Sequence, residues 1–113
     1  MIRVIVAGGR HYNNYPLLCK KLDHLLQHHG LVEIVSGGAS GADKLGERYA
    51  LERGYSLATF PADWSLGKRA GPIRNEQMAK YATHLVAFPG GRGTANMIEQ
   101  AKANGLHVRI VGA

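Results

Sequence analysis

Two kinds of apolar pattern alternate along the chain. Short runs rich in β-branched residues, such as residues 2–8, are typical of buried strands. Longer segments between them carry apolar residues at helical spacing, as Leu18, Leu22 and Leu26 do. The pattern predicts strands at 2–8, 31–38, 55–60, 84–89 and 107–112, and helices at 15–30, 40–54, about 72–82 and 93–104.

The alternation of strands and helices sets the expected fold class. Parallel strands joined by right-handed helical crossovers form a sheet that is covered on both faces. The sequence therefore predicts an α/β protein, a single Rossmann-like three-layer sandwich with a mainly parallel five-stranded sheet, in which residues 1–113 form one domain. In the second helix we expect Leu45, Tyr49 and Leu51 to be among the packing residues.

Glycine-rich segments follow three of the predicted strands. The carboxyl ends of parallel strands meet at one edge of a sheet, where open α/β proteins bind their ligands. We therefore expect the three segments to lie together and to bind a ligand. Their residues are Gly8, Gly9 and Arg10; Ser36, Gly37, Gly38, Ala39, Ser40 and Gly41; and Pro89, Gly90, Gly91, Gly93 and Thr94.

The chemistry of these segments suits a phosphate group. Glycine lets the backbone approach a ligand closely, and free N–H groups at a helix N-terminus attract an anion. The hydroxyls of Ser36, Ser40 and Thr94 would add donors, although Ser40 and Thr94 are equally suited to capping their helices. Neither G-x-x-x-x-G-K-[ST] nor G-x-G-x-x-G with its partner acid occurs, which disfavours an ATPase or an NAD-dependent dehydrogenase. We predict no resident cofactor.

A polar stretch at 61–72 has the character of a lid loop between the third strand and the third helix. Trp64, the only tryptophan, is suited either to stacking on a base or to packing against the domain. Lys68, Arg69 and Arg74 are candidates for phosphate contacts, and Arg74 is the best placed if it opens a helix. For Lys68 and Arg69 a solvated surface is the alternative.

Charge and composition narrow the choice of partner. Fourteen Lys plus Arg against eight Asp plus Glu give a formal net charge of +6, which favours a nucleotide-derived small molecule or, as the less favoured choice, nucleic acid. The single cysteine, Cys19, permits no intramolecular disulfide, and neither a secretory leader nor a membrane-length apolar stretch is visible. We therefore expect a cytoplasmic protein with no membrane partner.

Histidines offer little support for a metal site. His24 and His28 are four residues apart on a predicted helix, a spacing that permits a shared metal ion. No cysteine or carboxylate constellation accompanies them, so we predict no bound metal.

Four motifs together resemble one known family. They are VAGGR at 6–10, SGGASGAD at 36–43, GPIRNEQM at 71–78 and FPGGRGTANM at 88–97. The combination is similar to the YspA/YpsA-related branch of the SLOG superfamily, which also includes the Lonely Guy phosphoribohydrolases and the DprA DNA-processing proteins. The resemblance implies a Rossmann-like fold that binds nucleotides or nucleotide-derived ligands. It also makes a homo-oligomer the expected assembly.

The Lonely Guy enzymes cleave the N-glycosidic bond of nucleoside monophosphates and carry the motifs R-K-x-x-M and P-G-G-x-G-T-x-x-E. This chain matches the first at Arg74 and Met78, but Asn75 replaces the lysine. It matches the binding half of the second, but Met97 replaces the glutamate and cannot ionise. Glu99 is two residues further on, turned by about 200° around a helix. The resemblance therefore implies binding without the enzymes' catalytic acid.

Two other acids are candidates for the site. Asp43 falls in the first turn of the second helix, where it is suited to complementing the helix dipole, to hydrogen bonding a ribose hydroxyl or to acid–base work. It is the one candidate catalytic residue. Asp63, in the lid-like stretch, and Asn75 complete the candidate ligand-binding residues.

We interpret the sequence as a binding module for a nucleotide or nucleotide-derived ligand, such as a sensor, a carrier or a sequestering protein. The alternative is a Lonely Guy-like N-glycosidic hydrolase of nucleoside 5′-monophosphates, which Met97 disfavours. A second alternative is a single-stranded nucleic-acid binder. The net charge and the resemblance to DprA favour it, but few exposed aromatics beyond Trp64, Tyr12 and Tyr15 are available for a stacking track.

Overall fold

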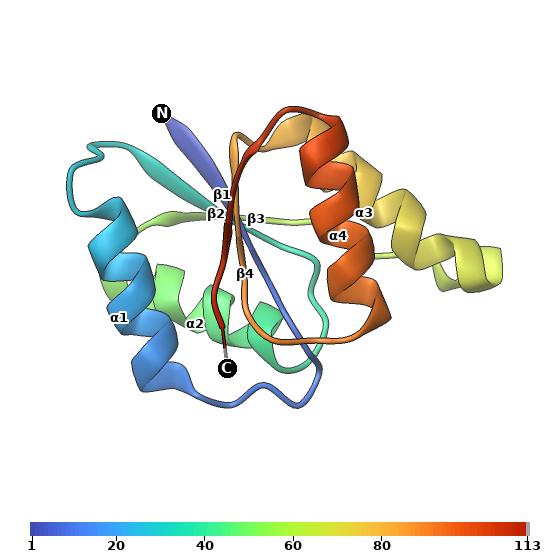
Figure 1. Ribbon diagram of the computed structural model, residues 1–113, viewed down its shortest axis with the longest axis horizontal. Helices are drawn as coiled ribbons and strands as arrows, with labels where there is room; N and C mark the ends of the chain where they lie inside the picture. Colours follow the sequence, from blue (N-terminus) through green and yellow to red (C-terminus); the bar gives the residue numbers. More distant parts are fainter. Residues whose placement is uncertain (113) are drawn as a thin grey trace.

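Residues 1–112 are described by a computed structural model, in which five strands and their connecting helices follow one another in regular order (Figure 1). The strands are β1 (Ile2–Ala7), β2 (Val32–Ser36), β3 (Ser56–Thr59), β4 (His84–Ala87) and β5 (His107–Ile110). The helices are α1 (Tyr15–Leu26), α2 (Ala42–Arg53), the 3₁₀ helix η1 (Trp64–Arg69), α3 (Ala70–Tyr81) and α4 (Arg92–Ala103). Each strand and α-helix expected from the sequence is present, with its ends displaced by up to four residues.

The sheet has the strand order β3-β2-β1-β4-β5, and every neighbouring pair is parallel. This arrangement confirms the predicted fold class. The chain turns from β1 towards β2 and β3 and then returns to the other side of β1, where β4 pairs with it from Val4–His84 to Ala7–Ala87. The carboxyl ends of β1 and β4 are thus a topological switch point, the place where such sheets bind ligands. Because all strands point the same way, the two ends of the chain lie at opposite edges of the sheet (Figure 1).

Helices cover both faces of the sheet, α1 and α2 on one side and α3 and α4 on the other (Figure 1). Val4 and Val6 of β1 pack in the first of these layers, whereas Ile5 and Ala7 pack in the second. Burial on both faces explains why β1 is a continuous apolar run and not an alternating one.

The ends of the first two helices follow from local sequence. Asn14 caps α1, since its side chain accepts a hydrogen bond from Leu17 N at 3.2 Å. Gly54 ends α2 in the left-handed conformation, with φ of 71°, and its N–H bonds to the carbonyls of Ala50 and Leu51.

The expectation that Leu51 packs is wrong, because its side chain is 83% exposed. The buried side of α2 is formed by Ala42, Gly46, Tyr49 and Ala50, and Leu51 falls outside that stripe. Tyr49 is fully buried, as predicted, and Leu45 is partly buried against the same cluster.

Residues 61–72 differ most from the sequence prediction, since they are largely helical and not a loop. Asp63 begins η1 by accepting hydrogen bonds from Ser65 N at 3.1 Å and Ser65 Oγ at 2.6 Å. Pro72 sits in the first turn of α3, where its missing N–H has no helical partner to lose. No residue of η1 is buried, and the segment extends away from the sheet (Figure 1).

No helix within residues 1–112 has the length and apolar character needed to span a membrane.

Candidate ligand-binding site

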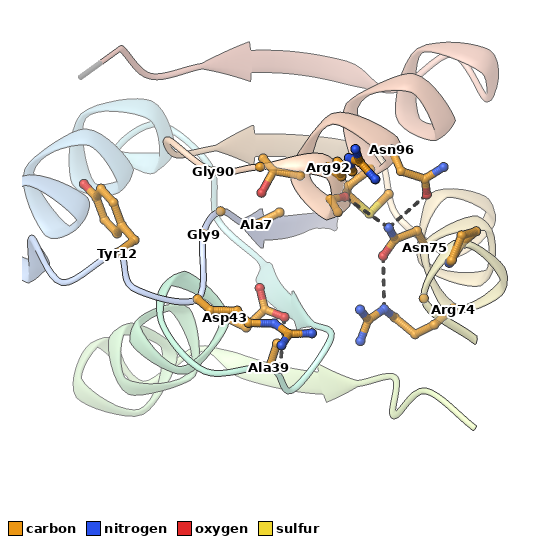
Figure 2. A pocket seen from close by; sticks show the side chains of 18 of the residues that line it. Ala7, Gly9, Tyr12, Ala39, Asp43, Arg74, Asn75, Gly90, Arg92 and Asn96 are labelled. Atoms are coloured by element: carbon orange, nitrogen blue, oxygen red, sulfur yellow. Dashed lines mark hydrogen bonds between the residues drawn. The ribbon is translucent and has the colours of Figure 1, made fainter. Parts of the chain in front are cut away.

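A cavity of about 980 Å³ lies at the carboxyl ends of β1 and β4 (Figure 2). Its wall is built from the segment after β1, the start of α2, η1, the first half of α3 and the start of α4. The volume is at the upper end of the range for small-molecule and cofactor sites. The lining residues are Ala7, Gly8, Gly9, Arg10, His11, Tyr12, Ala39, Asp43, Trp64, Lys68, Gly71, Pro72, Arg74, Asn75, Met78, Pro89, Gly90, Gly91, Arg92, Gly93, Thr94, Asn96 and Met97.

Most of the residues singled out in the sequence meet around this cavity. The segments after β1 and β4 line it as expected, together with Ala39, Asp43, Trp64, Lys68 and Arg74. Seven candidates do not line it: Ser36, Gly37, Gly38, Ser40, Gly41, Asp63 and Arg69.

Ser36, the last residue of β2, and Gly41 in the segment that follows contact other parts of the protein instead of the cavity. Ser36 is fully buried, and its hydroxyl donates to Glu47 Oε2 at 2.6 Å and accepts from Gly38 N at 3.0 Å. Gly41 has a positive φ of 75°, and a Cβ there would overlap the backbone of Gly9 and Arg10. Gly41 therefore packs the connection after β2 against the connection after β1, and of residues 36–43 only Ala39 and Asp43 line the cavity.

The N-terminus of α4 faces the cavity without a side-chain cap. The N-cap residue is Gly91, and no side chain in the described part of the chain accepts a capping bond there. The capping role considered for Thr94 is wrong, since Thr94 lies inside the first turn of α4, and Ser40 likewise does not cap α2, whose N-cap is Gly41. The first N–H groups of α4 thus keep their hydrogen-bonding capacity for another acceptor.

Glycines in the loop before α4 serve different purposes. A Cβ on Gly90 would overlap Thr94 Oγ1 and lie 2.6 Å from Gly9 N, so this glycine packs the β1 and β4 connections together. Gly91 and Gly93 have nothing within 4 Å of an added Cβ and border open space. They leave the start of α4 accessible to a ligand.

Charge in the lining is strongly unbalanced. Arg10, Lys68, Arg74 and Arg92 face one acid, Asp43, among the lining residues. A concave surface with this composition attracts anions.

Asp43 is buried, with 8% of its surface exposed, and its Oδ2 accepts a hydrogen bond from Ala39 N at 3.1 Å. Burial raises the pKa of its carboxyl to about 6, against the opposing effects of the Ala39 hydrogen bond and the Arg74 charge. The negative charge of Glu47 adds to the rise. A carboxyl with this pKa exchanges its proton near neutral pH, which is the property of an acid–base group.

Arg74 and Asn75 form a hydrogen-bonded network across the cavity wall (Figure 2). Arg74 donates from Nη1 to Gly37 O at 2.6 Å and from Nε to Asn75 Oδ1 at 3.0 Å. Asn75, only 5% exposed, donates from Nδ2 to Gly93 O at 3.3 Å and to Asn96 Oδ1 at 3.0 Å. The network ties the first half of α3 to the start of α4.

The described residues offer no candidate metal site. In residues 1–112, no cluster of three or more His, Cys, Asp or Glu side chains is arranged to hold a metal ion.

Comparison with known proteins assigns the chain to a family. Residues 2–67 match the YspA, cpYpsA-related SLOG family. The Gene 61 protein of Mycobacterium phage D29 is 34% identical over 119 residues, which cover 96% of this chain and 94% of the phage protein. The chain belongs to the YspA, cpYpsA-related SLOG family. The resemblance that the four sequence motifs indicated is thereby confirmed.

Two solved structures share the fold of this SLOG chain. The X-ray structure of TM1055, a structural genomics target, matches 96% of this chain and 72% of that one, with a TM-score of 0.73 and 23% identity. The X-ray structure of DNA processing protein A (DprA) from Streptococcus pneumoniae matches all of this chain with a TM-score of 0.79 and 19% identity. The SLOG chain spans 51% of that DprA chain.

Positions at which this SLOG chain departs from the hydrolase motifs lie in the cavity wall. Met97 and Asn75 both line the cavity, and Met97 is 1% exposed. Glu99 is exposed and lies outside the lining residues, on the side of α4 expected from its helical position. The wall therefore presents a thioether and an amide at these two positions.

Sequence reasoning missed several lining residues, among them Tyr12, Gly71, Pro72, Met78 and Asn96. Helical spacing would have found two of them. Met78 is one turn after the candidate Arg74 on α3, and Asn96 is about one turn after the candidate Gly93 on α4. Tyr12 packs on Phe88 with ring centroids 5.2 Å apart, a tertiary contact without a local signal.

Proposed function

We propose that this SLOG protein is a binding module for a nucleotide or nucleotide-derived ligand, acting as a sensor, a carrier or a sequestering protein. The observation that carries the proposal is the uncapped start of α4, where Gly91 and Gly93 leave the backbone accessible from the cavity. An anionic phosphate group is the natural acceptor for N–H groups at such a site. The surplus of Arg and Lys in the lining supports the same ligand charge.

The position of Trp64 supports an aromatic portion of the ligand. Its side chain lines the cavity, yet the residue is 63% exposed and belongs to a helix with no buried residue. An indole held in this way is available for stacking on a nucleobase. Lys68, which follows the kink at Gly67 in the same segment, also lines the cavity, and its ammonium group is available to a phosphate or ribose oxygen.

Hydrolysis of an N-glycosidic bond is the second candidate function, and Asp43 is the observation that favours it. Its buried carboxyl, with a pKa of about 6, lies in the cavity wall. Two substitutions argue against hydrolysis. Met97 stands where the hydrolases have their glutamate, and Asn75 stands where they have their lysine. Neither side chain transfers a proton at neutral pH. We therefore propose binding without rapid chemistry.

Native mass spectrometry of freshly purified protein tests the proposal directly. We expect a co-purified ligand whose mass matches a nucleotide derivative, and calorimetry should then show binding of AMP or ADP-ribose to the stripped protein. The same spectrum reports the assembly, for which we propose a homo-oligomer supported by the exposed Trp64, Leu66 and Ile73. Stripped protein that binds neither nucleotide would contradict the proposed function.

Salt dependence separates this function from binding of single-stranded nucleic acid. A polynucleotide that contacts many cations loses affinity steeply with salt, because each neutralised phosphate releases a counterion. We expect AMP affinity to change little between about 50 and 200 mM salt, and a dT oligonucleotide to bind weakly at both. Tight oligonucleotide binding with a steep salt slope would favour the nucleic-acid function, to which the net charge of +6 points.

A further inference from the structure

Two hydrogen bonds, from Nε and from Nη1, orient the guanidinium of Arg74. Nε donates to Asn75 Oδ1 and Nη1 donates to Gly37 O. A guanidinium has five N–H donors, so three remain without a partner among the described residues. Arg74 lines the cavity, and these remaining donors are available to a bound anion.

Gly37 leaves the space that this orientation needs. A Cβ on Gly37 would lie 2.6 Å from Arg74 Nη1 and 2.9 Å from Asp43 Oδ2. Any side chain at this position would displace the guanidinium, the Asp43 carboxyl or both. The guanidinium therefore rests directly against the backbone of the segment after β2.

The amide of Asn75 fits its surroundings in only one orientation. Its oxygen accepts from Arg74 Nε, which can only donate, and its nitrogen donates to Gly93 O, which can only accept. Rotating the amide by 180° would place two donors together and two acceptors together. The second hydrogen of Nδ2 bonds Asn96 Oδ1, so every hydrogen on this nitrogen is used.

We propose that Asn75 is a positioning residue, which aims the Arg74 guanidinium into the cavity and fixes it relative to the glycine loop of α4. The inference rests on the proposed function of the cavity. One end of the amide holds the cationic anion-binding group, and the other end holds the carbonyl of Gly93 in the first turn of α4. The guanidinium is thereby pre-organised beside the start of α4, so a phosphate that binds there does not have to order a long, flexible arginine.

A double-mutant cycle measured by AMP calorimetry tests this coupling. Arg74→Ala should weaken AMP binding on the order of 10- to 100-fold, and Asn75→Ala on the order of 3- to 10-fold. In the Arg74→Ala background, Asn75→Ala should change affinity by less than about twofold, because its effect is exerted through the arginine. Gln77→Ala, at an exposed position of the same helix, is the matched control and should leave AMP affinity unchanged.

A second variant changes the network at Asn96, its partly exposed residue on α4. Asn96→Ala removes one acceptor from Asn75 at a partly exposed position, where truncation is well tolerated. It should weaken AMP binding about twofold in the parent and not at all in the Arg74→Ala background. Equal losses in both backgrounds, for either asparagine, would show a general structural effect and overturn the proposal.

NMR of the ligand-free protein gives a readout that does not depend on the ligand. The Nε–H of Arg74 should give a resolved signal that exchanges slowly with water in the parent and in Gln77→Ala, and it should lose this protection in Asn75→Ala. An unchanged Arg74 signal in Asn75→Ala would overturn the proposed positioning role. If the parent protein does not bind AMP, the proposed function is contradicted. The NMR signal tests the contact between Asn75 and Arg74 independently of AMP binding.

Discussion

Asp43 is an acid that the fold buries beside cations, and its protonation links folding to pH. An unfolded aspartate has a pKa near 3.9, whereas burial raises the pKa of Asp43 in the folded protein to about 6. The folded state therefore holds this proton more tightly than the unfolded state. Its contribution to stability is fully present below about pH 4 and is lost as pH rises through 6.

Replacing Asp43 with asparagine should stabilise the ligand-free protein at pH 8, because the amide carries no buried charge and can still accept from Ala39 N. We expect a gain on the order of 1–3 kcal/mol at pH 8 that falls to less than half at pH 4.5. Urea unfolding of both proteins at the two pH values measures it. Gln77→Ala, at an exposed position without a titratable group, is the control and should change the free energy of unfolding equally at both pH values. A gain of equal size at both pH values would show that the carboxyl is not desolvated as described.

At the level of elements, the start of α4 is the feature on which phosphate binding depends. Gly91→Val should abolish binding of AMP and leave the fold intact, because an added Cβ at Gly91 meets no atom within 4 Å of the protein. Gly91 has φ of −104° and ψ of −139°, outside the main β region, so circular dichroism and thermal unfolding of the variant should confirm that the fold is retained. Gly30→Val is the matched control, since Gly30 also has open space around it but lies between α1 and β2, away from the cavity. Undiminished AMP affinity in Gly91→Val, measured by calorimetry, would show that this loop serves only as a turn and does not bind phosphate.

The same elements show what sequence reasoning can and cannot reach. Strand and helix order followed from apolar periodicity, because burial on two faces leaves a strong local signal in segments such as β1. The 61–72 segment was misjudged because its polar composition was taken as that of a loop, whereas Asp63 begins the 3₁₀ helix η1 and α3 follows directly from Ala70. Leu51 was misjudged because hydrophobicity alone does not tell which side of α2 faces the sheet.

Sequence reasoning placed candidate residues at the cavity where topology brings loops to one edge of the sheet, and it failed to do so where tertiary contacts decide. Glycines after β1 and β4 line the cavity, because parallel strands deliver their carboxyl ends together. The end of β2 is followed by an equally glycine-rich segment. There, however, the hydroxyl of Ser36 bonds Glu47, and Gly41 packs against the backbone of Gly9. Only the folded arrangement separates loop residues that pack against one another from those that face a ligand.

For the molecule as a whole, the cavity should bind without rapid bond cleavage. Removal of an acid–base group typically costs 10²- to 10⁴-fold in rate, and Met97 occupies the position where the related hydrolases have their acid. Incubation with AMP followed by an assay for free adenine should show at most slow release. Fast release that Asp43→Asn abolishes would contradict the binding proposal and make Asp43 a catalytic residue. Adenine release gained in Met97→Glu would show that AMP is held in the hydrolytic orientation.

The parallel sheet also decides how this protein can be handled as a reagent. The chain enters β1 at one end of the parallel strands and leaves β5 at the other (Figure 1). The cavity lies at the carboxyl ends of the strands, which is the end at which β5 finishes. An affinity tag or surface anchor placed before Met1 points away from the cavity and leaves its mouth free. The same tag attached after β5 starts at the end of the sheet that also carries the cavity. Immobilisation through the N-terminal end is therefore the geometry in which a ligand-capture experiment reports the cavity itself.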